Sequence, residues 1–183
     1  PAVFMSVSAT TNAGFDIVGN SLIPFADDYF IQFVNIILIV FGSIGYAVLI
    51  EVKAFLTRKP TQSAYQFSLY TKLTTFTFFA LIVVGTVLIL VLEYNHFFVG
   101  KSWDNSFFYA LFQSVTTRNA GLATMDVSQF TNPTLFVMCI LMFIGASPSS
   151  VGGGIRTTTF AINILFLYHY ARGSESIKIF NRE

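Results

Sequence analysis

Long stretches without a charged residue are the feature of this sequence that most limits its fold. Residues 29–50, 73–92, 127–155 and 157–171 contain no Asp, Glu, Lys or Arg. An α-helix of about 20 apolar residues crosses the hydrocarbon core of a bilayer. Only 10% of the 183 residues are charged and 54% are apolar, which leaves too little charge to cover the surface of a soluble domain. We therefore expect an all-α polytopic membrane protein.

The composition also excludes several classes of protein. A net charge of +1 offers no basic surface for nucleic acid, and a single cysteine, Cys139, excludes a disulfide framework or a cysteine-based zinc site. His96 and His169 have no second ligand nearby, which favours placement at the membrane interface. Because the sequence shows no nucleophile–base pair or metal cluster, we expect neither an enzyme nor an organic cofactor. The chain begins at Pro1 without a leader, and we interpret it as a piece of a longer polypeptide.

The charges between the apolar stretches orient them in the membrane. We predict spanning helices at Tyr29–Ile50, continuing to about residue 58, and at Lys72–Leu92. The connector 59–71 and its flanks are basic, because Lys53, Arg58, Lys59 and Lys72 outnumber Glu51, whereas the segment 93–105 is not. The positive-inside rule therefore places the connector in the cytoplasm, the second segment outside and the tail from Arg172 in the cytoplasm.

Two segments depart from the pattern of simple spanning helices. Residues 103–115 predict a helix of roughly 20 Å, too short to cross; we interpret it as re-entrant, since both its flanks must be extracellular. The last apolar stretch, from about Asn132 to Ala171, is interrupted at Gly145–Gly154, where Pro148 removes an amide and three consecutive glycines disfavour helix. Its two helical flanks are together long enough to cross the bilayer, which puts the break near the midplane.

An internal repeat connects the two halves of the chain. Ser6–Phe15 parallels Ser114–Leu122 with one residue deleted, so that Asn-Ala-Gly recurs 107 residues apart. Each copy is followed by a polar loop and then a spanning helix. The repeating unit is therefore a helix, a short re-entrant helix, a polar glycine-containing loop and a second helix.

This unit divides the chain into four parts. Residues 1–58 are the end of one unit, and residues 59–71 are a cytoplasmic connector. Residues 72–172 form a complete second unit, and residues 173–183 begin the connector to the next.

The unit favours a cation pore on physical grounds. A re-entrant helix directs the negative end of its dipole toward the membrane centre, and the loop after it can present backbone carbonyl oxygens in place of hydration water. Gly14 and Gly121 suit such a backbone because they lack a Cβ. We expect the two loops to face a common axis, with these glycines at similar depth. The candidate ion-binding residues, acting mainly through backbone carbonyls, are Thr11, Asn12, Ala13, Gly14, Arg118, Asn119, Ala120 and Gly121.

Three motifs together resemble a known family. Thr-Thr-Asn-Ala-Gly-Phe-Asp, Thr-Thr-Arg-Asn-Ala-Gly-Leu and Gly-Ala-Ser-Pro-Ser-Ser-Val-Gly-Gly-Gly-Ile-Arg-Thr-Thr-Thr are similar to motifs of the Trk/Ktr/HKT superfamily of potassium transporters, in particular its KtrB-type membrane subunits. The resemblance covers essentially the whole chain. It implies four such units around one pore, each with one filter glycine, and potassium as the transported ion.

The same resemblance implies further properties. It implies a multi-pass protein of the cell membrane, surrounded by membrane lipid, that forms a homodimer and binds a cytosolic nucleotide-binding regulatory ring of the KtrA type. It implies an intramembrane gating loop beneath the filter. It also places the Arg118 side chain behind the filter, paired with an acid for which Asp16 and Asp126 are local candidates. The residues of the gating loop are Gly145, Ala146, Ser147, Pro148, Ser149, Ser150, Val151, Gly152, Gly153 and Gly154.

Some alternatives remain open at the level of the sequence. A broken-helix secondary transporter for a small solute also uses discontinuous helices at the midplane, although it needs no second Asn-Ala-Gly loop. Arg156 is either a paired or snorkelling residue at the cytoplasmic mouth or a pore charge that limits permeation. Gly42 and Gly45 favour close helix packing, with a hinge as the lesser alternative.

Overall fold

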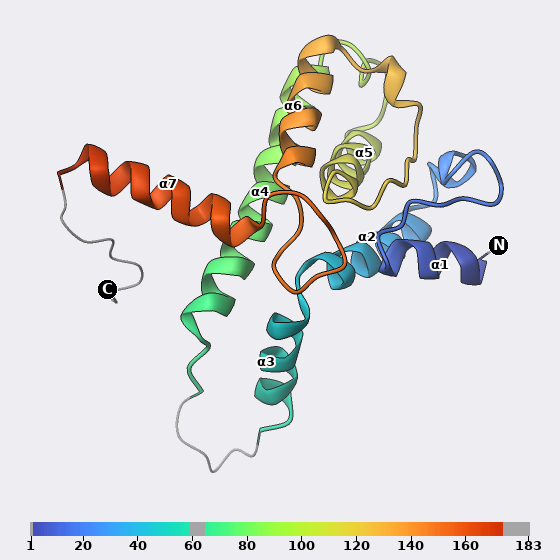
Figure 1. The fold of residues 1–183 in the computed structure, drawn as a ribbon. Coiled ribbons are helices and arrows are strands. Elements are labelled where there is room, and N and C mark those ends of the chain that lie inside the picture. Colours follow the sequence, from blue (N-terminus) through green and yellow to red (C-terminus); the bar gives the residue numbers. More distant parts are fainter. Residues whose placement is uncertain (1, 59–64, 174–183) are drawn as a thin grey trace.

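The computed structural model describes residues 2–58 and 65–173, and within these ranges it is helical and contains no strand (Figure 1). This confirms the predicted all-α class. Residues 59–64 of the predicted connector and residues 174–183 of the predicted tail lie outside the described residues. The α-helices are α1 (Ala2–Thr10), α2 (Tyr29–Ser43), α3 (Tyr46–Leu56), α4 (Leu69–Glu93), α5 (Trp103–Thr116), α6 (Asn132–Phe143) and α7 (Thr157–Ala171), with short 3₁₀ turns at Ile23–Phe25 and Val127–Gln129.

Helix α4 is the axis around which the second unit is built. It has 25 residues and is the one described helix that is long and apolar enough to cross a bilayer by itself. Helices α3, α5, α6 and α7 all pack against it. Gly85 allows α5 to come close, because a Cβ at this position would overlap the Ser114 hydroxyl, which donates a hydrogen bond to the Ile82 carbonyl oxygen at 2.8 Å.

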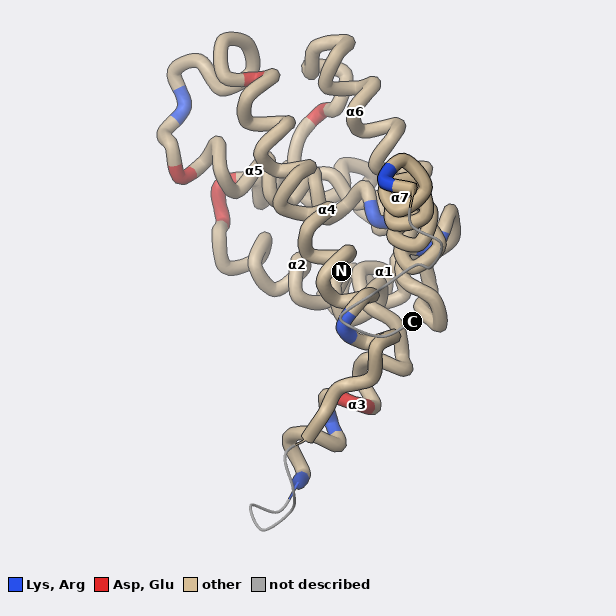
Figure 2. Tube along the Cα trace, turned by 90° about the vertical axis from the view of Figure 1, so that its left-hand side faces the viewer, with Lys and Arg blue, Asp and Glu red and all other residues tan. Residues whose placement is uncertain are grey.

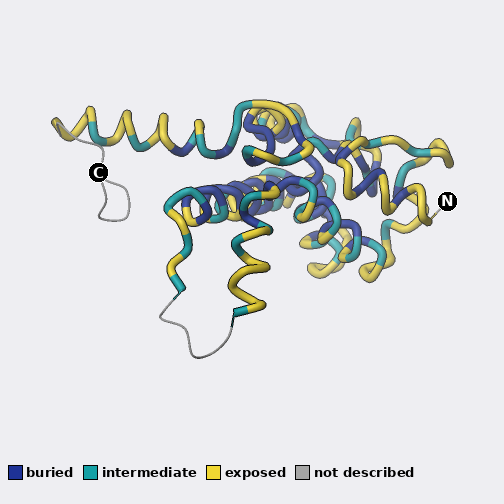
Figure 3. The backbone as a smooth tube through the Cα atoms, turned by 60° about the horizontal axis from the view of Figure 1, so that its bottom comes forward, coloured by how far each residue is buried: buried dark blue, intermediate teal, exposed yellow. Residues whose placement is uncertain are grey.

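The apolar side chains that α4 does not bury face outward. Phe76 and Val91 are 70% and 68% exposed, which suits a surface in contact with lipid rather than with water. Figure 3 shows the buried residues concentrated where α4 meets its neighbours, while α3 and α7 are exposed over much of their length.

The first predicted spanning helix is bent rather than continuous, so the prediction of a single helix over Tyr29–Ile50 is wrong. Helices α2 and α3 meet at an angle of 105°. Gly45 stands at the bend with a φ of +97°, a conformation that glycine adopts at little cost. Gly42, by contrast, serves the close packing that we expected, because a Cβ there would overlap the Thr10 carbonyl oxygen.

The predicted break in the last helix is confirmed, but its two flanks do not form one crossing. Helix α6 ends at Phe143 and α7 begins at Thr157. Figure 1 shows that α7 leads away across α4 instead of continuing the axis of α6. The reason is that the chain returns to the point at which it left α6: the Ile155 amide donates a hydrogen bond to the Phe143 carbonyl oxygen at 3.1 Å.

Charged residues are unevenly distributed along the molecule. Figure 2 shows most acidic residues toward the end where α4 stops and α6 starts, and basic residues around α3 and α7. Glu93 ends α4 and Asp104 lies in the first turn of α5, whereas Lys53 lies in the last turn of α3, with Glu51 as an acidic exception in the same helix. This distribution agrees with the orientation that we predict from the positive-inside rule.

Candidate pore site

The two predicted filter loops lie against each other. Each follows a short helix, α1 or α5, and each ends in a glycine of left-handed conformation: φ is +70° at Gly14 and +71° at Gly121. A Cβ built on Gly121 would lie 3.1 Å from the Cα of Gly14, and one built on Gly14 would lie 2.9 Å from the Ala120 carbonyl oxygen. The structure therefore brings together the two sets of residues that the sequence singled out.

The repeat is preserved in hydrogen bonds as well as in sequence. The Ser8 hydroxyl donates to the Phe15 carbonyl oxygen at 2.8 Å, and the Thr116 hydroxyl donates to that of Leu122 at 2.5 Å. The hydroxyl residues are 108 positions apart and their acceptors 107. The one-residue deletion therefore falls between them and leaves the bond that braces each loop intact.

Asparagine has a structural role in these loops that the sequence analysis did not recognise. Asn12 and Asn119 have φ values of +50° and +78°, so each Asn-Ala-Gly segment contains two left-handed residues. Asparagine is among the few residues other than glycine that adopt this region readily. The recurrence of Asn two places before Gly was the signal that could have revealed it.

The helix before each loop directs the negative end of its dipole at the loop. Helix α5 has 14 residues, close to the predicted 103–115, and its C-terminal end runs directly into Thr117 and Arg118. The last carbonyls of a helix have no intrahelical partner and carry a partial negative charge. The ends of α1 and α5 therefore favour a cation at the loops. Within the described ranges, no group of three or more His, Cys, Asp or Glu side chains could hold a metal ion.

Arg118 is fully buried and does not use the acid that was expected for it. Its Nη1 donates to the Ile144 carbonyl oxygen at 2.6 Å, and in the described parts of the chain it has no acidic partner. Asp16 accepts from the backbone amides of Val18 and Ser21, and Asp126 caps the turn that starts at Val127.

Both candidate acids are stabilised by their own loops. The bond from the Val18 amide, above all, lowers the pKa of Asp16, and hydrogen bonding to Ser128 lowers that of Asp126. Arg118 instead occupies the end of α6, where Ile144 is the C-cap and the dipole is negative.

The loop between α6 and α7 closes on itself at a narrow neck. The Ala146 amide donates to the Gly153 carbonyl oxygen at 3.1 Å. This bond lies next to the one from the Ile155 amide to the Phe143 carbonyl oxygen, on the side toward the middle of the loop. Gly145 and Gly154 lie so close together at this point that a Cβ on Gly145 would overlap the Gly153 carbonyl oxygen. We call residues 143–146 and 153–155 the neck, and residues 147–152 the tip.

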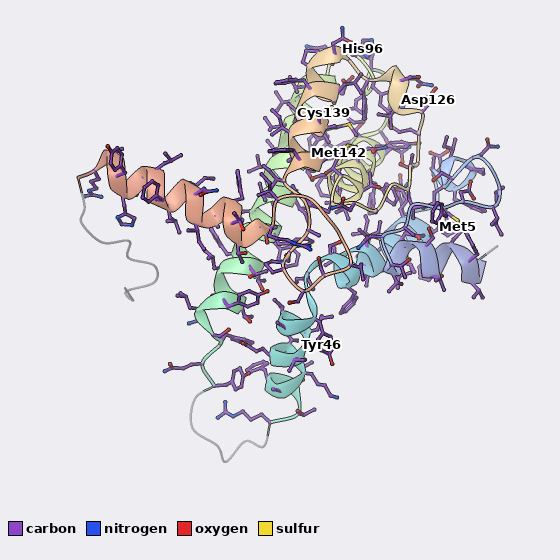
Figure 4. All side chains as sticks on the ribbon, viewed as in Figure 1. Met5, Tyr46, His96, Asp126, Cys139 and Met142 are labelled. Carbon is purple, nitrogen blue, oxygen red and sulfur yellow. The ribbon has the colours of Figure 1, made fainter. Side chains whose placement is uncertain are left out.

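The tip is docked into the bend between α2 and α3. The amides of Ser147 and Val151 donate to the carbonyl oxygens of Ser43 and Gly42, at 3.0 and 3.3 Å. The Tyr46 amide in turn donates to the Ser149 carbonyl oxygen at 2.8 Å. Tyr46, which is labelled in Figure 4, therefore lies beneath the loop, while His96 and Asp126 lie at the other end of the molecule. The left-handed backbone at the bend frees the amide of Tyr46 for this contact.

Two side chains complete the docking of the tip. The Tyr70 hydroxyl of α4 donates to the Pro148 carbonyl oxygen at 3.2 Å. Arg156 uses one nitrogen, Nη1, to reach the carbonyl oxygens of Gly152 at 2.5 Å and Ser147 at 3.3 Å. Arg156 is therefore paired in the structure, and its partner is the backbone of the loop.

Comparison with known proteins places this arrangement in a family. A family model described as a cation transport protein, TrkH, matches residues 1–182. The chain belongs to the TrkH family. It is 59% identical over 180 residues to the Ktr system potassium uptake protein D of Bacillus subtilis, and 34% identical over 183 residues to the Ktr system potassium uptake protein B of Vibrio alginolyticus.

The fold agrees with this membership. The structure of the potassium transporter TrkH from Vibrio parahaemolyticus superposes with a TM-score of 0.75 at 20% identity, over 94% of this chain and 36% of that one. The chain spans about 40% of the length of the two Ktr proteins. Membership of this family makes it a multi-pass protein of the cell membrane.

Proposed function

We propose that the complete protein moves potassium ions across the cell membrane through a pore, and that the loops ending in Gly14 and Gly121 form neighbouring parts of its filter. The observation that carries this proposal is the contact between these two glycines at the ends of two equivalent half-helices. The printed names of the relatives, which are potassium uptake proteins, supply the ion. This filter holds the ion with backbone carbonyls of residues 11–14 and 118–121.

The electrostatics of the site support a cation rather than an anion. Two helix C-termini point at the loops, and each contributes a partial negative charge. Arg118 is the charged side chain beside the filter, and its guanidinium turns away to the end of α6. A small-solute carrier with broken helices remains the alternative, but the paired Asn-Ala-Gly loops would have no role in it.

In this proposal the loop 145–154 is the gate. An irregular backbone at membrane depth survives where it is buried in protein or lines a wet cavity, and this loop is bonded to the filter on one side and to the bend between α2 and α3 on the other. Its polar groups are small and uncharged, so they can exchange partners without exposing a buried charge.

The assembly around the pore is also part of the proposal. The complete protein carries further units of the same kind, forms a homodimer in membrane lipid, and responds to a cytosolic nucleotide-binding ring of the KtrA type. It requires no organic cofactor. The names of the relatives, which refer to a Ktr system, support partner subunits.

The test is potassium flux through the full-length protein carrying Gly121→Ser, measured in proteoliposomes and by growth of a host deficient in potassium uptake. A Cβ at φ +71° and 3.1 Å from Gly14 should distort the ligands, so we expect the preference for potassium over sodium to fall about tenfold. Gly100→Ser is the matched control, since Gly100 has a φ of +81° but no atom within 4 Å of its added Cβ. An unchanged ion preference in Gly121→Ser would reject the filter.

A further inference from the structure

Two consecutive residues of the second filter loop donate hydrogen bonds to the two sides of the neck of the gating loop. Arg118 donates to the Ile144 carbonyl oxygen on the side that leaves α6, at 2.6 Å. The Asn119 Nδ2 donates to the Gly153 carbonyl oxygen on the side that returns to α7, at 3.1 Å. The neck is therefore fastened directly to the filter, whereas the tip is fastened to the bend of another unit.

The first filter loop uses its asparagine differently. The Asn12 Nδ2 donates to the Ser43 hydroxyl at 3.2 Å, and Ser43 reaches the gating loop only through its own carbonyl oxygen, which accepts from the Ser147 amide. In the described residues, the direct side-chain link between a filter and the neck thus belongs to the second unit. The equivalent position in the repeat has the same residue and conformation but another partner.

The gating loop approaches the Asn119 side chain closely. A Cβ built on Gly152 would lie 3.2 Å from Asn119 Nδ2 and would overlap the Cβ of Ala146. Glycine at 152 therefore allows the tip to fold back under the asparagine. This explains why the glycine run begins at 152, a feature that the flexibility of the loop does not by itself account for.

We infer that Asn119 is a positioning residue for the gate: its side chain holds the neck in register with the filter and thereby favours the closed loop, a role separate from that of its backbone carbonyl in the proposed filter. This inference rests on the proposed function. A movement of the whole loop away from the filter must break the bond from Asn119 to Gly153, whereas a movement of the tip alone need not. Losing the bond leaves no buried group unpaired, because the Gly153 carbonyl oxygen still accepts from Ala146. We therefore expect the fold to remain stable without the bond from Asn119 to Gly153, whereas the closed arrangement of the gate should become less stable.

The decisive variant is Asn119→Gly in the full-length protein. Glycine adopts the φ of +78° without strain, adds no charge near the ion path, and removes the donor. Losing one hydrogen bond that favours the closed loop should raise potassium flux in proteoliposomes without the regulatory partner about fivefold. The control Asn95→Gly replaces an exposed asparagine in the turn after α4, away from both filter loops, and should leave the flux as it is.

Asn119→Ala provides a second route to the same answer if the glycine variant inserts poorly. Alanine also removes the donor and adds no charge beside the proposed ion path, so flux should again rise. A fall in ion preference with flux unchanged or reduced would show that Asn119 only braces the filter, and would overturn the inference. Unchanged flux and unchanged preference would overturn it as well.

Hydrogen exchange separates a failure of this inference from a failure of the proposed function. The amides of residues 144–156 should exchange about fivefold faster in Asn119→Gly than in the parent, while those of α4 should not change. This measurement needs no ion flux, so it tests the attachment of the neck even if the parent protein carries no potassium. Equal exchange rates in the two proteins would refute the attachment.

Discussion

The guanidinium of Arg156 and the carbonyl oxygen of Gly152 are 2.5 Å apart, and this contact holds the end of the tip of the loop between α6 and α7. Because the same nitrogen also reaches Ser147 at 3.3 Å, one side chain holds both ends of the tip. A charged donor makes a stronger bond to a carbonyl than a neutral one does. The residue therefore stabilises one arrangement of the tip.

We predict that Arg156→Gln raises partner-independent flux about fivefold, because a shorter, neutral side chain cannot reach both carbonyl groups. Hydrogen exchange discriminates between the two roles considered for this residue. If its hydrogen bonds hold the tip, the amides of residues 147–152 exchange faster in Arg156→Gln than in the parent; if only its charge limits permeation, they exchange at the parent's rate. We expect the first result, and parent-like exchange together with raised flux would contradict the bonding role.

The bend between α2 and α3 provides a test of how the tip is docked. Gly45→Ala introduces a Cβ that overlaps the Pro148 carbonyl oxygen, at a φ of +97°. The backbone strain alone costs about 1–2 kcal/mol, and Gly19→Ala, at φ +85° with no atom nearby, measures that strain separately. We expect the melting temperature of Gly45→Ala in detergent to lie several degrees below that of Gly19→Ala. Equal values would mean that the tip does not pack on the bend.

At the outer end, Glu93 joins α4 to the start of α6. This carboxylate is fully buried and accepts from the Thr131 amide at 2.8 Å and from the hydroxyls of Thr131 and Thr134 at 2.7 and 2.5 Å. Thr134→Val keeps the shape but removes one charge-assisted donor, and hydrogen bonds to charged groups contribute about 1.5–3 kcal/mol.

We therefore expect Thr134→Val to lower the melting temperature by several degrees. Thr75→Val, at a half-buried position on α4, serves as the control and should change it little. A Thr134→Val protein as stable as the parent would show that Glu93 is held by its other donors alone.

Length and charge were sufficient to predict the helices of the second unit. The limits of α4 and α5 fall within a few residues of those expected, and the break before α7 was visible from Pro148 and the glycines, because these features depend on local composition. The bend at Gly45 was not predictable in this way. It depends on the approach of Pro148, more than 100 positions along the chain, and a single glycine in an apolar run does not distinguish a bend from close packing.

The candidate site, like the fold, was predictable from the sequence only in part. The repeated Asn-Ala-Gly located both filter loops, since left-handed residues leave a signature in sequence. The partner of Arg118 could not be inferred, because it is a backbone carbonyl at a helix end and not a side chain. The division of the gating loop into neck and tip could not be inferred either. It arises because the neck is hydrogen-bonded to the second unit and the tip to the first.

That division changes how the gate should be tested by deletion. Removing Val151 to Gly153 would also remove the acceptor of Asn119 and Ala146 and open the neck. Removing Ser149 and Ser150 affects the tip alone: it takes away the acceptor of the Tyr46 amide and the Ser150 hydroxyl that donates to Ser147.

If the loop is the gate, the deletion of Ser149 and Ser150 should raise potassium flux several-fold and make it less dependent on the cytosolic partner, because a shorter tip reaches less far toward the bend. The neck deletion should instead lower the melting temperature, since the buried Ala146 amide loses its acceptor at a cost of about 1–3 kcal/mol. Flux in proteoliposomes with and without the partner, together with melting curves, measures both effects. A tip deletion that inserts normally yet conducts no more than the parent would show that the loop does not gate the pore.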